Sequence, residues 1–264
     1  ERIETDSTYD AGTTTQLMWG ARSDVGCVRP HNEDSYLVQS PLFCVCDGMG
    51  GHAAGEVASS IAVETIAKTA PQSADAARLA AAVEAANAAV IEAALNGLGK
   101  PGMGCTATCA YIENDTLAIA HVGDSRAYLL HEGTLIRVTR DHSYVEELVD
   151  AGEITADEAR VHPNRSVITR ALGSDPAMYA DHFTLHIEEG DRLILCSDGL
   201  SSMIPDSDIE NIATQSSTAQ ICVDNLVDAA LAAGGHDNVT VVVVDLVDDG
   251  VMREAQRVRR RNVT

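Results

Sequence analysis

The sequence has few aromatic residues, few cations and no long apolar run. Phe, Trp and Tyr make up 3% of the 264 residues, although hydrophobic residues make up 45%. The core must therefore be built mainly from Ala, Val, Leu and Ile. No apolar run approaches the roughly 20 residues that a membrane-spanning helix needs, and no signal peptide opens the chain. We therefore expect a soluble, cytoplasmic protein.

Basic residues are scarce and unevenly placed. The chain has 18 Lys and Arg against 40 Asp and Glu, a formal net charge of -22. This balance excludes a nucleic-acid partner bound through its phosphates, which would need a basic face. Five of the arginines lie in a basic C-terminal tail, residues 249–264. Because basic residues flank the cytoplasmic ends of membrane spans, this tail could lead to an anchor beyond the sequence, or it could be a plain C-terminus.

The seven cysteines show no paired zinc spacing. Most lie inside apolar, strand-like runs. We expect Cys44 and Cys46 to point to opposite faces of one strand, which is poor geometry for a chelate. Buried free thiols in a reducing cytoplasm are the favoured interpretation.

The order of elements predicts one domain at 17–248, preceded by a flexible lead-in at 1–16. Two helices, one at 52–68 and one capped by Ser73, precede a meander of closely spaced strands. That order argues against alternating βα units. A polar insertion at 141–173, with capping boxes at Ser143 and Thr155, is a candidate flap. Further helices are expected to start at Ser207 and Ser217, and the predicted strands lie at 17–23, 35–38, 43–46, 104–112, 116–122, 126–131, 135–138, 183–187, 192–196 and 239–246.

Carboxylates recur at the ends of these strands. Asp47 follows the apolar run 43–46 and is followed by Gly48. Asp-Gly is also an ordinary turn dipeptide, and this pattern alone favours a turn. However, Asp124, Asp198 and Asp237 also lie where apolar runs end or begin. Four acids at strand ends indicate one convergent site.

These acids are hard oxygen ligands with no thiolate or histidine pair beside them. Such ligands favour Mg²⁺ or Mn²⁺ over zinc or copper. Two such ions about 3.5 to 4 Å apart can acidify a water and bind phosphoryl oxygens. The loop at 29–34 carries Arg29, which suits a phosphate, together with Glu33 and Asp34. The same loop could also be a solvated surface cluster.

Six motifs in order, over about residues 19–247, resemble the metal-dependent serine/threonine protein phosphatases of the type 2C (PPM) class, bacterial branch. They are Arg29 to Asp34, Asp47-Gly48-Met49-Gly50-Gly51-His52, Gly104-Cys105-Thr106-Ala107, Gly123-Asp124-Ser125-Arg126, Cys196-Ser197-Asp198-Gly199-Leu200 and Gly235-His236-Asp237-Asn238-Val239-Thr240. The resemblance implies an α+β fold, a four-layer αββα sandwich of two antiparallel sheets flanked by helices. It also implies a metal cleft at one edge of the sheets.

The resemblance further implies a centre of two Mn²⁺ or Mg²⁺ ions, with a third in bacterial members. Asp47 would bridge two ions, and the Gly48 carbonyl would bind one of them. Asp198 and Asp237 would ligate the other ion, and Asp124 with Asp198 would hold the weaker third ion. In the same family pattern water attacks phosphorus directly, with no phosphoenzyme.

Other roles implied by the resemblance concern the substrate and the water. Arg29 would grip the phosphate, Glu33 would act on metal-bound water, and Asp34 and Asn238 would support the ligands. Asp47, Asp198, Asp237 and Arg29 are thus the candidate catalytic residues.

One position departs from the family pattern. Animal members carry a histidine, a proposed general acid, immediately after the Asp-Gly pair, and here that residue is Met49. His52 is a candidate acid three residues later, although it could equally cap or pack against the following helix. A metal-bound water could protonate the leaving oxygen instead.

The leading hypothesis is a phosphoserine/phosphothreonine protein phosphatase that opposes bacterial Ser/Thr kinases. Its expected partners are phosphorylated proteins, and a monomer is expected. A catalytically dead regulatory or sensing domain with the same fold is the alternative, and an acidic cation-binding protein is a third. A haloacid-dehalogenase-type phosphatase would need an Asp-x-Asp motif, which Asp47-Gly48-Met49 does not provide.

Overall fold

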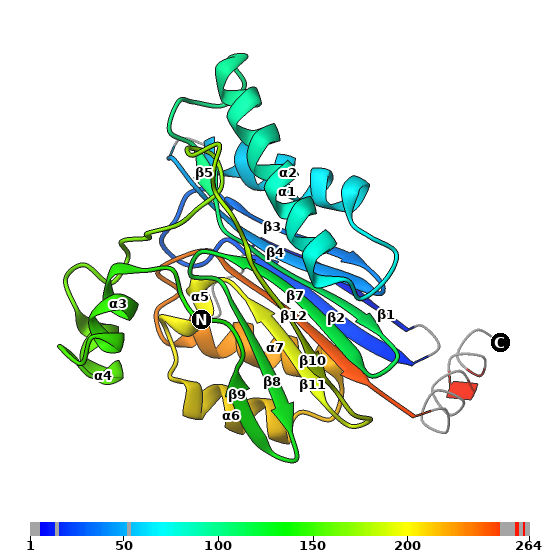
Figure 1. Cartoon of the computed structure of the whole chain (residues 1–264). Helices are drawn as coiled ribbons and strands as arrows, with labels where there is room; N and C mark the ends of the chain where they lie inside the picture. The colour runs from blue at the N-terminus through cyan, green and yellow to red at the C-terminus, as the bar shows by residue number, and fades with distance from the viewer. Residues whose placement is uncertain (1–5, 14–15, 52–53, 249–256, 259–260, 262–264) are drawn as a thin grey trace.

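The computed structural model describes residues 6–13, 16–51, 54–248, 257–258 and 261. It shows two antiparallel sheets packed face to face, with helices on both outer faces (Figure 1). The predicted four-layer αββα sandwich is confirmed.

The first sheet has the strand order β1-β2-β12-β11-β8-β9. These strands are β1 (Ser7–Thr13), β2 (Leu17–Asp24), β12 (Val239–Leu246), β11 (Arg192–Cys196), β8 (Arg126–His131) and β9 (Thr134–Arg137). Its outer face packs against α6 (Asp206–Gln215) and α7 (Ala219–Ala232), with α5 (Asp198–Ser201) at the end of β11.

The second sheet has the order β10-β7-β6-β4-β3, and β5 pairs with β4. Its strands are β10 (Asp181–His186), β7 (Thr116–Val122), β6 (Ala107–Glu113), β4 (Leu42–Met49), β3 (Asp34–Gln39) and β5 (Gly104–Cys105). Helices α1 (Ala54–Thr69) and α2 (Ala76–Leu95) cover its outer face. The strand predicted at 104–112 is therefore divided at Thr106.

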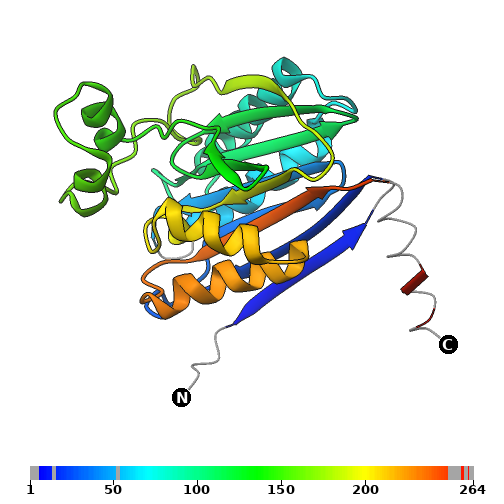
Figure 2. The same cartoon turned by 90° about the horizontal axis from the view of Figure 1, so that it is seen from below.

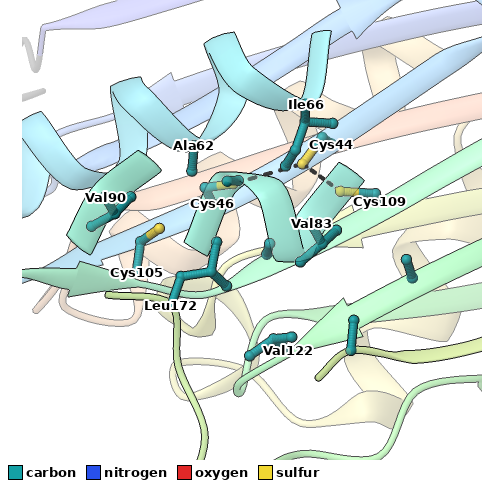
Figure 3. Packing of buried hydrophobic residues seen from close by; sticks show 14 of the residues in the cluster. Cys44, Cys46, Ala62, Ile66, Val83, Val90, Cys105, Cys109, Val122 and Leu172 are labelled. Atoms are coloured by element: carbon teal, nitrogen blue, oxygen red, sulfur yellow. Dashed lines mark hydrogen bonds between the residues drawn. The ribbon is translucent and has the colours of Figure 1, made fainter. Parts of the chain in front are cut away.

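Strand β4 shows how the layers are specified. Phe43 and Val45 point into the core between the two sheets. Cys44 and Cys46 point the other way, into the layer under α1 and α2 (Figure 3). This alternation follows from the two-residue period of a strand, and every second residue lies on the same face.

The expectation that Cys44 and Cys46 point to opposite faces is therefore wrong, because residues two apart share a face. Their Sγ atoms lie 3.7 Å apart, and Cys44 Sγ lies 2.9 Å from that of Cys109, its partner on β6 (Figure 3). All seven cysteines are free, and only Cys27 is exposed. Burial raises the pKa of the Cys44 thiol, and the sulfur contacts of Cys109 add to the rise. The buried thiols are thus held in the neutral form.

The flexible lead-in predicted at 1–16 is wrong for Ser7–Thr13, which forms β1. This strand pairs along its whole length with β2. Arg22 of β2 lies 5.2 Å from the Tyr9 ring and donates Nε to Ser7 Oγ at 3.2 Å. Most side chains of this edge strand are exposed, so it lacks the apolar alternation by which strands are recognised in a sequence. The sequence pattern therefore did not predict it.

Three helix starts differ from the prediction. The N-cap of α2 is Asp75, which accepts from Arg78 N, rather than Ser73. Helix α6 starts after Pro205 rather than Ser207, and Thr218 caps α7 rather than Ser217. Several capping residues stand close together at these places, so the sequence identifies the helix but not its first residue.

The insertion at 141–173 contains α3 (Tyr144–Asp150) and α4 (Ala156–Val161), which project from the sandwich (Figures 1 and 2). The capping box predicted at Thr155 is confirmed, because Thr155 and Glu158 make both of its bonds. At Ser143 the structure shows the N-cap half of the predicted box, in which Ser143 accepts from Glu146 N. We call residues 141–173 the flap.

Candidate metal centre

Two acids of the second sheet lie side by side at one edge. Asp34 begins β3 and pairs in register with Asp47 near the end of β4. Asp124 follows β7, which runs parallel to β4 because both pair antiparallel with β6. The ends of β4 and β7 therefore meet at the same edge of the sheet.

The first sheet contributes two more acids. Asp198 is the first residue of α5, directly after β11, and Asp237 precedes β12, which pairs antiparallel with β11. Ser197 N donates to Thr240 O at 3.0 Å, and Thr240 N donates to Ser197 Oγ at 3.0 Å. This exchange fixes the start of α5 beside the start of β12.

The acids interact strongly enough to perturb one another. Burial raises the pKa of Asp34 to about 7, and the charges of Asp198 and Asp237 contribute. Burial, with the charge of Asp198, raises the pKa of Asp237 to about 6. Burial and the charges of Asp34 and Asp198 raise the pKa of Asp47 well above its ordinary value. Burial and Asp198 do the same for Asp124. The structure thus brings all four predicted strand-end acids, and Asp34, into one electrostatic cluster.

Three carboxylate oxygens in this cluster are buried without a hydrogen-bond partner. They are Oδ1 of Asp34, Oδ1 of Asp124 and Oδ1 of Asp198. An unsatisfied buried oxygen is costly, and several in one cluster of like charge are costlier still. A divalent cation bound among them would satisfy the oxygens and reverse the pKa shifts. The residues therefore fit a Mg²⁺ or Mn²⁺ centre.

Gly48 is required by close packing. A Cβ atom there would lie 2.1 Å from the Gly55 carbonyl oxygen and 2.5 Å from the Glu33 carbonyl oxygen. Gly48 N donates to Glu33 O at 3.1 Å. The end of β4 is thus pressed between α1 and the 29–34 loop, which fixes the position of the Asp47 backbone.

Asn238 ties the 29–34 loop to the acids. Its Oδ1 accepts from Glu33 N at 2.9 Å, and its Nδ2 donates to the Val25 and His31 carbonyls at 2.9 Å each. Its side chain therefore holds backbone groups, in line with a supporting role.

Arg29 lies at the rim. Its Nε is 3.4 Å from Asp237 Oδ1, and its side chain is 56% exposed. An exposed guanidinium beside the acids remains accessible to an incoming anion. Glu33, in the same 29–34 loop, is half-buried.

Two threonines that were given no role by sequence reasoning support the acids directly. Thr106 Oγ1 accepts from Asp47 N at 3.0 Å, and Thr240 Oγ1 donates to Asp34 Oδ2 at 2.7 Å. Both lie within motifs of the resemblance, and that was the available signal. Sequence reasoning gave no role to His142 either. In the structure its ring accepts a hydrogen bond from Gly123, the residue before Asp124. His52, the candidate acid, lies outside the described residues, as does most of the basic tail.

The family model described as "Protein phosphatase 2C" matches residues 20–239, most of the chain. The chain belongs to the protein phosphatase 2C family. The matched range of this phosphatase 2C domain contains all five clustered acids.

Its relatives are bacterial serine/threonine phosphatases. The chain is 43% identical over 244 residues to serine/threonine protein phosphatase PstP of Mycobacterium tuberculosis, covering 90% of this chain and 46% of PstP. It therefore spans about half the length of that relative. It is 37% identical to serine/threonine phosphatase stp of Listeria welshimeri, covering 85% of this chain and 94% of that protein.

Solved structures agree with these relatives. A crystal structure of M. tuberculosis PstP/Ppp matches with a TM-score of 0.84 and 42% identity, covering 88% of this chain and all of that one. The PstP catalytic domain in complex with two manganese ions matches with a TM-score of 0.81 and 40% identity, covering 88% of this chain and 99% of that one. In the described part of the phosphatase 2C domain, no helix is long and apolar enough to cross a membrane.

Proposed function

We propose that this domain hydrolyses phosphoserine and phosphothreonine in proteins at a centre of two Mn²⁺ or Mg²⁺ ions, with a third more weakly bound. The observation that carries the proposal is the cluster of five acids with three unpartnered buried oxygens. Family membership and the manganese complex of PstP support it.

In this proposal Asp47, the Gly48 carbonyl, Asp198 and Asp237 would hold two ions. Asp124 with Asp198 would hold the third. When bound, the ions acidify a water and offset the charge of the phosphoryl oxygens. The oxygens that lack partners in the protein thereby gain them.

The remaining residues position the substrate and the ligands. Arg29 binds the phosphate with its exposed guanidinium, beside Asp237. Glu33 accepts a proton from the attacking water. Asp34 and Asn238 hold the ligands and the 29–34 loop. Water oxygen bonds to phosphorus, the bond to the serine or threonine oxygen breaks, and that oxygen takes up a proton. Whether His52 supplies this proton is testable by the leaving-group dependence of a His52→Ala variant.

The partners in this proposal are phosphorylated proteins, including Ser/Thr kinases and their substrates. The flap projects from the sandwich (Figure 2). In this proposal it would contact the substrate protein around the phosphorylated residue. We place the protein in the cytoplasm, because its cysteines are free thiols. We also propose that it is a monomer.

The test is hydrolysis of a phosphothreonine peptide with Mn²⁺, with EDTA, and by Asp47→Asn and Asp198→Asn variants. We expect activity only with the ion, and a loss of at least a hundredfold in each variant. Asp115→Asn is the matched control, because Asp115 is exposed in the turn at the opposite end of β7. Activity that survives EDTA would refute the metal mechanism. Inactivity with every divalent ion would favour the dead regulatory domain.

A further inference from the structure

His142 is a buried histidine at the first turn of the flap, 3% exposed. It lies beside Gly123, the residue that precedes Asp124. Gly123 N donates to His142 Nδ1 at 2.9 Å, and His142 N donates to Gly123 O at 2.8 Å. Both peptide groups that flank the Gly123 Cα are therefore held by one residue of the flap.

These bonds fix the protonation state of the ring. A backbone amide can only donate, so Nδ1 must be the unprotonated acceptor and Nε2 must carry the proton. Nε2 lies 2.8 Å from Asp181 Oδ2 on β10, which accepts that proton's hydrogen bond. Asp181 thus selects the tautomer that can hold Gly123.

The opposite side of Gly123 is closed as well. A Cβ atom on Gly123 would lie 2.5 Å from Thr106 Cγ2. Thr106 also accepts from Asp47 N and bonds the Ser125 hydroxyl. The 123–125 loop is therefore held between Thr106 and His142. Oδ1 of Asp124, in this loop, is buried and has no hydrogen-bond partner.

The backbone of His142 and its partner Asp181 are both tied to the far end of the flap. Thr169 N donates to His142 O at 2.9 Å. Arg170 Nη1 donates to Asp181 Oδ1 at 2.8 Å, and the Arg170 guanidinium stacks 4.3 Å from the Tyr179 ring. Asp181 therefore accepts hydrogen bonds from both ends of the flap, from His142 at its start and from Arg170 at its end.

We propose that His142 is a positioning residue: held by Asp181, its ring fixes the Gly123–Asp124 loop so that Asp124 can bind a metal ion, and it links this ion to both ends of the flap. This inference rests on the proposed function, in which Asp124 holds the weaker third ion. The bridging ligand Asp47 has its own support from Thr106, so the loss of His142 is expected to affect the weaker ion selectively.

The experiment is a calorimetric Mn²⁺ titration of the whole chain without substrate. His142→Ala removes the acceptor for Gly123 N, whereas His142→Asn offers an amide oxygen in place of Nδ1. Asp181→Ala removes the group that orients the ring, together with the Arg170 ion pair, and leaves the ring itself in place. His186→Ala on the same strand as Asp181 is the control, because its side chain is 64% exposed.

In wild type we expect tight binding followed by a weaker event. His142→Ala should raise the Kd of the weaker Mn²⁺ site about tenfold. The Kd of the tight binding should change by less than about twofold. His142→Asn should recover most of the loss. Asp181→Ala should add little in the His142→Ala background, because both substitutions break one unit. The control should bind like wild type.

Three results would overturn the proposal: an unchanged weaker event in His142→Ala, equal weakening of tight and weak events, or no weaker event in wild type. Thermal unfolding in EDTA distinguishes a folding defect from a specific loss of metal binding. If the alanine variant is unfolded, the His142→Asn variant is used for the test instead. Because binding is measured without substrate, a normal titration in a protein that does not hydrolyse phosphopeptides would refute the proposed function while leaving the role of His142 intact.

Discussion

Asp34 offers the sharpest test of the electrostatics, through an Asp34→Asn substitution in the metal-free protein. The side chain is buried, and its Oδ2 accepts from Thr240 while its Oδ1 has no partner. Asparagine keeps the size and an acceptor oxygen for Thr240, but it cannot ionise. The substitution therefore removes one charge from the cluster with little change in packing.

The magnitude follows from the pKa of Asp34, which is raised to about 7 from 3.8. Between these values the native state holds a proton that the unfolded state has lost, so the free energy of unfolding falls as pH rises. Three pKa units at about 1.4 kcal/mol each give about 4 kcal/mol at pH 7. This is an upper limit, because a neighbouring acid of the cluster can take the proton instead.

Asparagine escapes this loss, so the metal-free variant should be more stable than wild type at pH 7. At about 2–4 °C per kcal/mol, the limit corresponds to a Tm higher by about 10 °C. At pH 4 the gap should nearly vanish. The buried His121, with its pKa lowered to about 4 by burial and the neighbouring His142, adds pH dependence to both proteins equally and cancels in the comparison.

The assay is thermal and urea unfolding of both proteins in EDTA from pH 4 to 8, repeated with saturating Mn²⁺. The ion should shrink the gap, because it offsets the charge that the substitution removes. A variant no more stable than wild type at pH 7 in EDTA, or a gap independent of pH, would refute the reasoning.

Three further substitutions test packing and the rim. Gly48→Ala places a Cβ 2.1 Å from the Gly55 oxygen, so we expect a loss of about 2–4 kcal/mol in urea unfolding together with loss of activity; a stable, active variant would contradict the close-packing argument. Arg29→Ala should lower kcat/KM for a phosphopeptide at least tenfold with Tm unchanged, because the side chain is exposed; a fall in Tm would instead indicate a structural role. Arg192 donates Nε to Asp245 at 2.6 Å and donates Nη1 to two backbone carbonyls at the end of α6. Arg192→Met should therefore lower the free energy of unfolding by about 3–5 kcal/mol. An unchanged urea midpoint would show that these contacts make no net contribution to stability.

The limits of the sequence are clearest where a local signal was weak or duplicated. The edge strand Ser7–Thr13 has no apolar period, and only its pairing with β2 makes it a strand. At the start of α2, Ser73 and Asp75 are both residue types that cap helices, and in the structure Asp75 is the cap, accepting from Arg78 N. The shared face of Cys44 and Cys46, by contrast, follows from the sequence alone, because residues two apart in a strand point the same way.

The family and the four strand-end acids could be predicted without coordinates, because glycine and carboxylate types at fixed places in apolar runs are local features of the sequence. Asp47 was recognisable in this way. The folded structure was needed to show which oxygens lack partners, that Asp34 is buried with its pKa raised to about 7, and that His142 holds the loop before Asp124. These features depend on burial, desolvation and mutual repulsion between residues brought together from different strands, and no local sequence pattern encodes them.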